Sequence, residues 1–131
     1  MVEKAPIRGD ISMLPKYRMS IDGIGCQKDH CLEAISDFLL TLTSTLKVRP
    51  RASQIYEVTD LVPNAMPGVS ASVIFLESSL VLHTYPGKKE AALDLNVCKE
   101  IDFKTVERAF KLFFQPKVID VKISYVVEVV R

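Results

Sequence analysis

One serine in this chain has residues of catalytic type at short spacings around it. Ser78 follows Glu77 at the end of an apolar run, and three further residues lie nearby: Ser70 eight positions before it, His83 five after it and Cys98 twenty after it. A serine could act as a nucleophile, and a histidine suits proton transfer because its pKa lies near neutrality. The G-x-S-x-G turn of the α/β-hydrolases is absent from the sequence. Structural alternatives stay open: a turn serine bonded to backbone, a core histidine and a small buried cysteine.

The surrounding stretch, GVSASVIFLESSLVLHTYPGKKEAALDLNVC, spans residues 68–98 and resembles the prokaryotic S-adenosylmethionine decarboxylases. That family's pattern runs approximately G-V-S-G, an apolar stretch, E-S-H, I-H-T-W-P-E and then a cysteine. The matching positions fall in register without a gap: Gly68-Val69-Ser70, Glu77-Ser78, His83-Thr84, Pro86, Asp94 and Cys98. The close match covers about a quarter of the chain, and residues 18–67 resemble the family only in element order and hydrophobic pattern.

The resemblance implies that the protein makes its own cofactor by cutting its backbone between Glu77 and Ser78. The Ser78 hydroxyl would attack the Glu77 carbonyl carbon and convert the amide to an ester. Removal of the Cα proton of residue 78 would then eliminate the Glu77 carboxylate, and the dehydroalanine left behind would tautomerise and lose ammonia to become a pyruvoyl group. By the same resemblance His83 and Ser70 assist processing, His83 by proton transfer.

In turnover, the resemblance implies that the pyruvoyl carbonyl forms a Schiff base with the substrate amine and accepts the electrons released with carbon dioxide. This is the electron-sink role that pyridoxal phosphate has elsewhere. Cys98 is implied to return a proton to the substrate carbon, and Tyr85 and Glu77 are candidate substrate-binding residues. Neither a metal nor pyridoxal phosphate is expected.

Three positions depart from the family pattern. Ser79 replaces the histidine after the cleavage serine, Tyr85 replaces tryptophan, and Gly87 replaces the glutamate that follows the proline. The glycine removes a carboxylate suited to hold ribose hydroxyls or the charged part of a nucleoside substrate. The substrate therefore stays open between S-adenosylmethionine, arginine and ornithine. Three carboxylates are candidates for holding a basic amino acid: Asp22, Glu57 and Asp60.

Hydrophobic periodicity predicts the elements that position these residues. A helix is expected to begin near His30, with Asp29 as its cap and the histidine in solvent, and to end before Arg49-Pro50. A second amphipathic helix is expected over 103–115, and strands over 17–26, 52–62, 69–77, 80–84, 91–97 and 119–129. Two helices and five or six strands predict an α/β (α+β) two-layer sandwich, a mainly antiparallel sheet with both helices on one face.

The composition is that of one soluble domain over residues 1–131, with residues 1–15 as a loose arm that lacks the pattern of a secretory signal. A formal net charge of +1 argues against nucleic-acid and anionic-membrane partners. No apolar run approaches the roughly 18 residues of a membrane span. Three cysteines without metal-binding spacing favour a reduced, cytoplasmic protein, in which Cys26 and Cys31 are structural.

The leading hypothesis is a self-processing, pyruvoyl-dependent decarboxylase of a small-molecule amine substrate, most simply S-adenosylmethionine, supplying the aminopropyl donor for spermidine and polyamine synthesis. Because the strand before Glu77 has few polar residues on either face, a second copy is expected to cover the free sheet face. The resemblance likewise implies a homodimer of cleaved protomers with active sites near the interface. Two alternatives remain: the same chemistry on arginine or ornithine, and a non-processing, non-catalytic regulatory or binding homologue.

Overall fold

The structure is a computed structural model that describes residues 17–48, 50–58, 68–75 and 78–125, with the backbone alone for 50–58. Its regular elements follow one another along the chain as β1 (Tyr17–Ile24), α1 (Leu32–Thr45), β2 (Pro50–Val58), β3 (Gly68–Phe75), β4 (Ser78–Tyr85), the 3-10 turn η1 (Pro86–Lys88), β5 (Glu90–Val97), α2 (Phe103–Phe114) and β6 (Val118–Tyr125). The predicted strands 52–62, 69–77 and 119–129 extend past the described residues.

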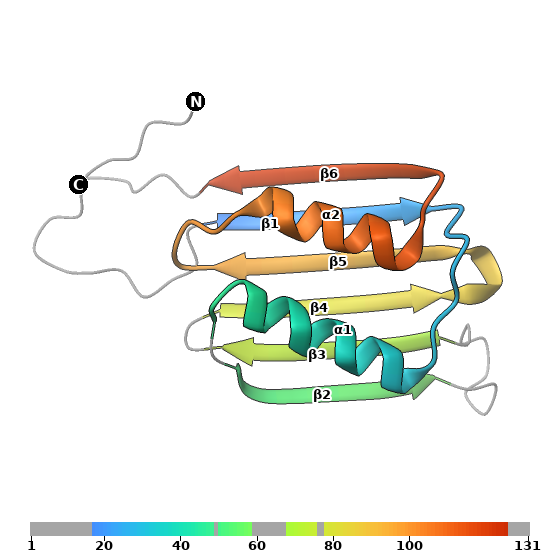
Figure 1. Cartoon of the computed structure of the whole chain (residues 1–131), viewed down its shortest axis with the longest axis horizontal. Helices are drawn as coiled ribbons and strands as arrows, with labels where there is room; N and C mark the ends of the chain where they lie inside the picture. Colours follow the sequence, from blue (N-terminus) through green and yellow to red (C-terminus); the bar gives the residue numbers. More distant parts are fainter. Residues whose placement is uncertain (1–16, 49, 59–67, 76–77, 126–131) are drawn as a thin grey trace, which may run out of the picture.

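The six strands form one sheet in the order β2-β3-β4-β5-β1-β6, and every neighbouring pair is antiparallel. Both helices lie on the same face of this sheet (Figure 1). The predicted two-layer α+β sandwich is therefore confirmed. No element in the described ranges covers the other face of the sheet, which is called the open face below. The predicted dimer stays a prediction.

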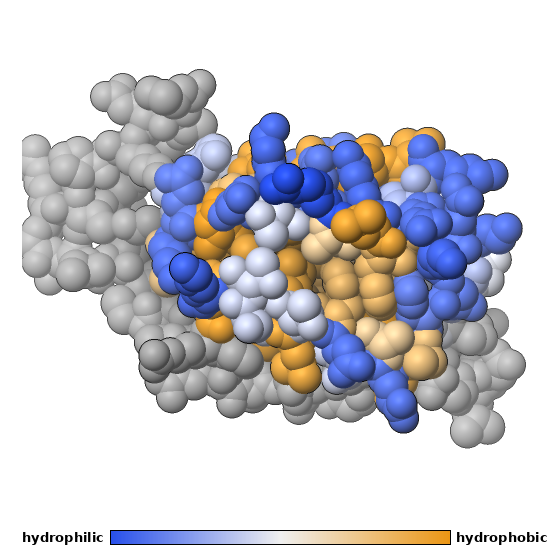
Figure 2. Space-filling view, viewed as in Figure 1, coloured by the Kyte–Doolittle hydropathy of each residue, from blue (hydrophilic) through white to orange (hydrophobic). Residues whose placement is uncertain are grey.

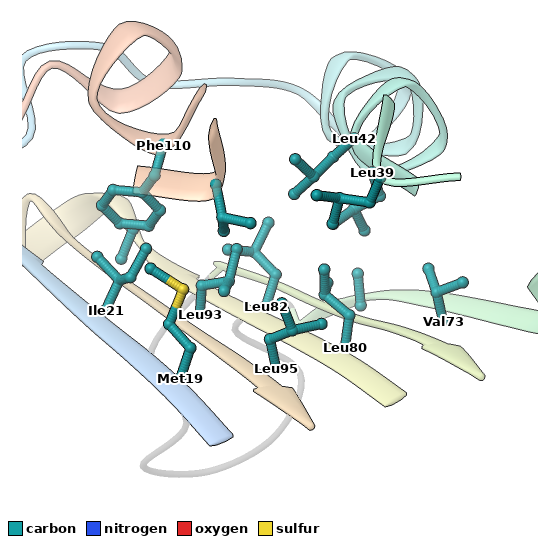
Figure 3. Close-up of a cluster of buried hydrophobic side chains, with 14 of the residues drawn as sticks. Met19, Ile21, Leu39, Leu42, Val73, Leu80, Leu82, Leu93, Leu95 and Phe110 are labelled. Carbon is teal, nitrogen blue, oxygen red and sulfur yellow. The ribbon is translucent and has the colours of Figure 1, made fainter. Parts of the chain in front are cut away.

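The hydrophobic core lies between the sheet and the two helices (Figure 3). Strand side chains alternate between the two faces, so every second residue of a central strand points toward the helices. Leu80 and Leu82 of β4 meet Leu39 of α1 in this way, and Phe110 of α2 packs over the neighbouring strands (Figure 3). Burial of these large side chains supplies the main driving force for the fold, about 1.5–3 kcal/mol for each one.

The start of α1 differs from the prediction. The helix begins at Leu32, its N-cap is Cys31, and no side chain caps it. Asp29 lies two residues too early for its carboxylate to bond the N–H groups of the first turn, which a capping side chain must reach. The predicted Asp29 cap is therefore wrong.

The prediction that His30 lies in solvent is wrong, because its ring contacts the end of α2. Its Nε2–H donates a hydrogen bond to the Phe113 carbonyl oxygen, and its ring stacks on the Phe113 ring with centroids 3.6 Å apart. Phe113 in turn stacks on Phe38 of α1 at 4.2 Å. The three rings join the β1–α1 connection, α1 and the end of α2. The helix face of the molecule shows hydrophobic side chains gathered between the two helices (Figure 2).

The N-cap of α2 leads to a prediction on acid stability. The Asp102 carboxylate accepts hydrogen bonds from the Thr105 hydroxyl at 2.9 Å and from the backbone N–H groups of Thr105 and Lys104 at 3.3 and 3.1 Å. These bonds, that of the Thr105 hydroxyl first, lower the pKa of Asp102 below its ordinary value. A carboxyl group whose pKa is lower in the folded protein than in the unfolded chain stabilises the fold at pH values above its unfolded-state pKa. That stabilisation is lost as pH falls through its folded-state pKa.

Asp102→Ala is therefore expected to lower Tm at pH 7 and to lower it less as pH falls below about 4. Thermal melts of both proteins at pH 7 and at about pH 3 measure the difference. An equal Tm difference at both pH values would show that the ionised carboxylate is not the stabilising form.

Candidate active site

Ser78 and Cys98 meet at one end of the sheet. Ser78 is the first residue of β4, and antiparallel pairing of β4 with β5 sets Ser79 opposite Asn96, so the start of β4 lies beside the end of β5. The Cys98 backbone N–H donates a hydrogen bond to Ser78 Oγ at 3.3 Å, and both residues are partly buried. The twenty-residue spacing thus corresponds to an antiparallel hairpin whose open ends carry the two side chains. Glu77 lies outside the described residues.

A cavity of about 310 Å³ opens beside Ser78. It lies where α1 ends, β4 begins and β5 ends, which is one edge of the molecule in Figure 1. Its walls combine the hydrophobic side chains Phe75, Val97 and Val48 with the polar residues Ser78, Cys98, Lys47 and Lys99. The cavity therefore gives a small molecule access to the Ser78 hydroxyl and to Cys98.

Ser70 and His83 form a second pair. They are direct partners in the register of β3 with β4, and a hydrogen bond of 2.8 Å joins Ser70 Oγ to His83 Nδ1. Their neighbours along each strand, among them Val69 and Leu82, are buried beneath the helices. By strand alternation, Ser70 and His83 project from the open face.

The structure does not bring these two pairs together within one protomer. Ser78 and His83 are five residues apart on β4, which at the strand rise is about 16 Å. The odd spacing also turns their side chains to opposite faces of the sheet. Ser78 with Cys98 and Ser70 with His83 are thus two separate half-sites.

Thr84 has a role that the sequence reasoning missed. This buried side chain lies between β4 and β3, where the Val69 backbone N–H donates to Thr84 Oγ1 at 3.0 Å. It therefore holds the two strands in register directly beside the Ser70–His83 pair. Its place in the H-T-x-P part of the motif was the signal that could have identified it.

Other candidate residues lie on or near the open face. The Tyr85 ring is stacked near the His83 ring, with centroids 6.3 Å apart, and 37% of the residue is exposed. Asp22 of β1 is exposed. Asp22 and His83 pair with Ala92 of β5 from its two sides, so they lie two strands apart across the sheet. Gly87 lies in η1, and a Cβ there would meet no atom within 4 Å. The Glu57 side chain and Asp60 lie outside the described residues.

The remaining cysteines lie away from the Ser78 cavity. Cys26 is buried, and burial first, then the charge of Glu90, raises the pKa of its thiol. Cys31 is exposed at the start of α1. Among the residues that the structure describes, no group of three or more histidine, cysteine or acidic residues could hold a metal ion, and no helix could span a membrane.

The sequence profile described as S-adenosylmethionine decarboxylase matches residues 17–125. The chain belongs to the S-adenosylmethionine decarboxylase family. The matched range contains all four residues of the two half-sites, and it confirms the resemblance drawn from residues 68–98. Family membership points to decarboxylation as the class of activity.

A solved structure agrees with this family assignment at the level of the fold. The crystal structure of the adenosylmethionine decarboxylase from Aquifex aeolicus VF5 has a TM-score of 0.71 to this chain, covering 90% of this chain and 95% of that one at 19% sequence identity. A search of curated proteins found no match. The S-adenosylmethionine decarboxylase fold is therefore shared although most residues differ.

Proposed function

We propose that this protein is a self-processing, pyruvoyl-dependent S-adenosylmethionine decarboxylase that supplies the aminopropyl donor for polyamine synthesis in the cytoplasm. The observation that carries the proposal is the placement of Ser78 beside Cys98 at an open cavity, in a chain of this family. A serine with a merely structural role would not require a thiol and an accessible cavity at the same place.

The surroundings of Ser78 fit a carbonyl group formed from it. Its side-chain oxygen accepts the Cys98 N–H at 3.3 Å, and that donor would be released to another acceptor at residue 78 when the oxygen leaves in the Glu77 carboxylate. A pyruvoyl group there would supply an electrophilic carbonyl and an electron sink for decarboxylation. The Cys98 thiol borders the same cavity, where it would return a proton to the substrate carbon.

Formation of that group would use the chain's own residues. The Ser78 oxygen would attack the Glu77 carbonyl carbon, the C–N bond would break, and an ester would replace the amide. Proton removal from the Cα of residue 78 would then break the bond between its Cβ and the ester oxygen, and that oxygen would leave in the Glu77 carboxylate. The dehydroalanine left at residue 78 would tautomerise to an imine, and water would hydrolyse it, releasing ammonia and leaving the pyruvoyl carbonyl. A histidine held at Nδ1 by a serine, as His83 is by Ser70, is suited to these proton transfers.

The ends of β4 that carry the two half-sites, about 16 Å apart in one protomer, would be brought closer by a homodimer. Packed sheets lie about 10 Å apart. If two copies stack open face to open face about a two-fold axis running across the strands, the backbone at the start of β4 in one copy comes over the Ser70–His83 end of the other, while the Ser78 side chain itself stays on the helix side of its own sheet. Exposed hydrophobic side chains on the open face would be covered by such packing: Ile24, Ile74, Tyr85 and Val118.

The intact mass of freshly purified protein under denaturing conditions tests the proposal. Two fragments, one ending at Glu77 and one beginning with a pyruvoyl group at residue 78, are expected. S-adenosylmethionine, arginine and ornithine would then be assayed side by side, and S-adenosylmethionine is expected to be the best substrate. A single full-length mass after prolonged incubation would contradict self-processing and leave a non-catalytic homologue.

Cys98→Ala separates cleavage from turnover. The hydrogen bond to Ser78 comes from the Cys98 backbone, which alanine keeps, so both fragments are expected to form. Loss of the thiol is expected to lower kcat by about 10²-fold or more, the usual contribution of a general acid. Fragment masses and steady-state rates on S-adenosylmethionine measure the two effects, and an unchanged kcat would remove Cys98 from the proton-donor role.

A further inference from the structure

Two lysines border the Ser78 cavity and have no role in the scheme above. Lys47 follows the end of α1, and Lys99 follows Cys98; both side chains are exposed. None of the described residues lining the cavity is acidic, and the other walls are mainly hydrophobic. The two ammonium groups therefore make the entrance to this cavity favourable for an anion.

The backbone at Lys47 is unusual for a lysine. Its φ is 58°, in the left-handed region, where the side chain of an L residue is strained. The Lys47 N–H donates to the Ser44 carbonyl oxygen and the Val48 N–H to that of Thr43, both at 3.1 Å, which is the helix-ending arrangement that most often contains glycine. A strained residue beside a candidate site is a reason to look for a function.

We propose that Lys47 and Lys99 recognise the α-carboxylate of the amino-acid substrate. The carboxylate would lie between the two ammonium groups while the substrate amine reaches residue 78. This inference rests on the proposed function and specifies its substrate as an amino acid with a free α-carboxylate. The cationic remainder of the substrate must then extend away from the lysines, which would repel it.

The same arrangement favours product release. Decarboxylation removes the only group that the lysines attract and leaves an amine product that carries positive charge alone. The electrostatic interaction at the cavity entrance therefore changes from attraction to repulsion as the reaction proceeds. Because this attraction is weaker once the carboxylate begins to leave, it is expected to act on KM and not to raise kcat.

Lys47→Gly and Lys99→Gln test the proposal on the cleaved enzyme. Each is expected to raise KM for S-adenosylmethionine about tenfold, the size of one charged hydrogen bond, without lowering kcat. The inhibition constant of decarboxylated S-adenosylmethionine is expected to stay the same or to fall. The assignment would be overturned by an unchanged KM or by a loss of cleavage. It would also be overturned if KM for S-adenosylmethionine and the inhibition constant of the decarboxylated compound rose equally.

A matched control separates strain from recognition. Gln115 ends α2 with the same left-handed backbone, at φ 48°, and does not line the cavity. Both Lys47→Gly and Gln115→Gly relieve such strain, so both are expected to raise Tm by about 3 °C, whereas only Lys47→Gly changes KM. A rise in KM with Gln115→Gly would mean that the effect comes from loosening a helix end.

A binding measurement keeps this test independent of turnover. In a Ser78→Ala background, calorimetry should show S-adenosylmethionine binding about tenfold more weakly when Lys47 is also glycine, with no loss for the decarboxylated compound. If the wild-type chain stays uncleaved, the proposed function fails, yet this comparison still tests the lysines. Equal affinities with and without Lys47 would overturn the carboxylate assignment alone.

Discussion

Ser78→Ala is expected to give a single full-length chain without decarboxylase activity. The substitution removes the oxygen proposed to attack the Glu77 carbonyl carbon and to leave in the Glu77 carboxylate, so no dehydroalanine and no pyruvoyl group could form at residue 78. Because Ser78 is partly buried and β4 pairs through its backbone, alanine should leave the fold intact. Intact mass, circular dichroism and a carbon dioxide release assay on the same preparation measure cleavage, folding and activity.

The adjacent serine provides the control. Ser79 has the same side chain one position later on β4, and strand alternation turns it to the opposite side. Ser79→Ala is expected to cleave and to turn over substrate as the wild type does. Cleavage or decarboxylation by Ser78→Ala would show that the reactive carbonyl does not come from residue 78.

Gly68→Ala is expected to cause the largest loss of stability of any conservative change near the site. A Cβ at Gly68 would lie 1.9 Å from the carbonyl oxygen and 3.0 Å from the carbonyl carbon of Thr84, both backbone atoms that cannot turn aside. β3 and β4 must separate at the point where the Val69 N–H bonds Thr84 Oγ1 and Ser70 bonds His83. A cost of about 3 kcal/mol or more is expected, with slower cleavage.

Chemical denaturation and the rate of fragment formation measure this effect. Gly87→Ala is the matched control, because a Cβ at that glycine meets no atom within 4 Å. It is expected to change the free energy of unfolding by less than about 0.5 kcal/mol. Equal stabilities for the Gly68 and Gly87 variants would mean that the close approach of Gly68 to Thr84 does not restrict this position.

The regular elements were predictable because their signals are local. β5 shows why: Leu93 and Leu95 alternate with polar residues, and this period already indicates which side faces the helices. Details that depend on distant residues were not predictable. His30 bonds and stacks on Phe113, 83 positions away, and no pattern around residue 30 indicates that partner.

The candidate site residues came from the sequence and their roles stay predictions, but their arrangement in the fold was only partly predictable. The motif names the candidate side chains, and the pairing of Ser78 with Cys98 follows once β4 and β5 are known to be antiparallel. The separation of Ser78 from His83 was missed for a specific reason. The predicted strand began at residue 80, which left Ser78 in a turn, whereas β4 begins at Ser78 and includes both residues. Their odd spacing then sends them to opposite faces.

The strand order β2-β3-β4-β5-β1-β6 has a consequence for a chain that is cut after residue 77. The first fragment would contribute β1, β2 and β3 and the second β4, β5 and β6, so β1 would be enclosed between two strands of the other fragment. The two pieces are therefore interlocked by three separate ladders and cannot part without dismantling the sheet. Assembly would have to precede cutting, since joining β1 to its neighbours is intramolecular only in the intact chain. Once unfolded, the cut protein would have to reassemble from two chains, at a rate that falls with dilution.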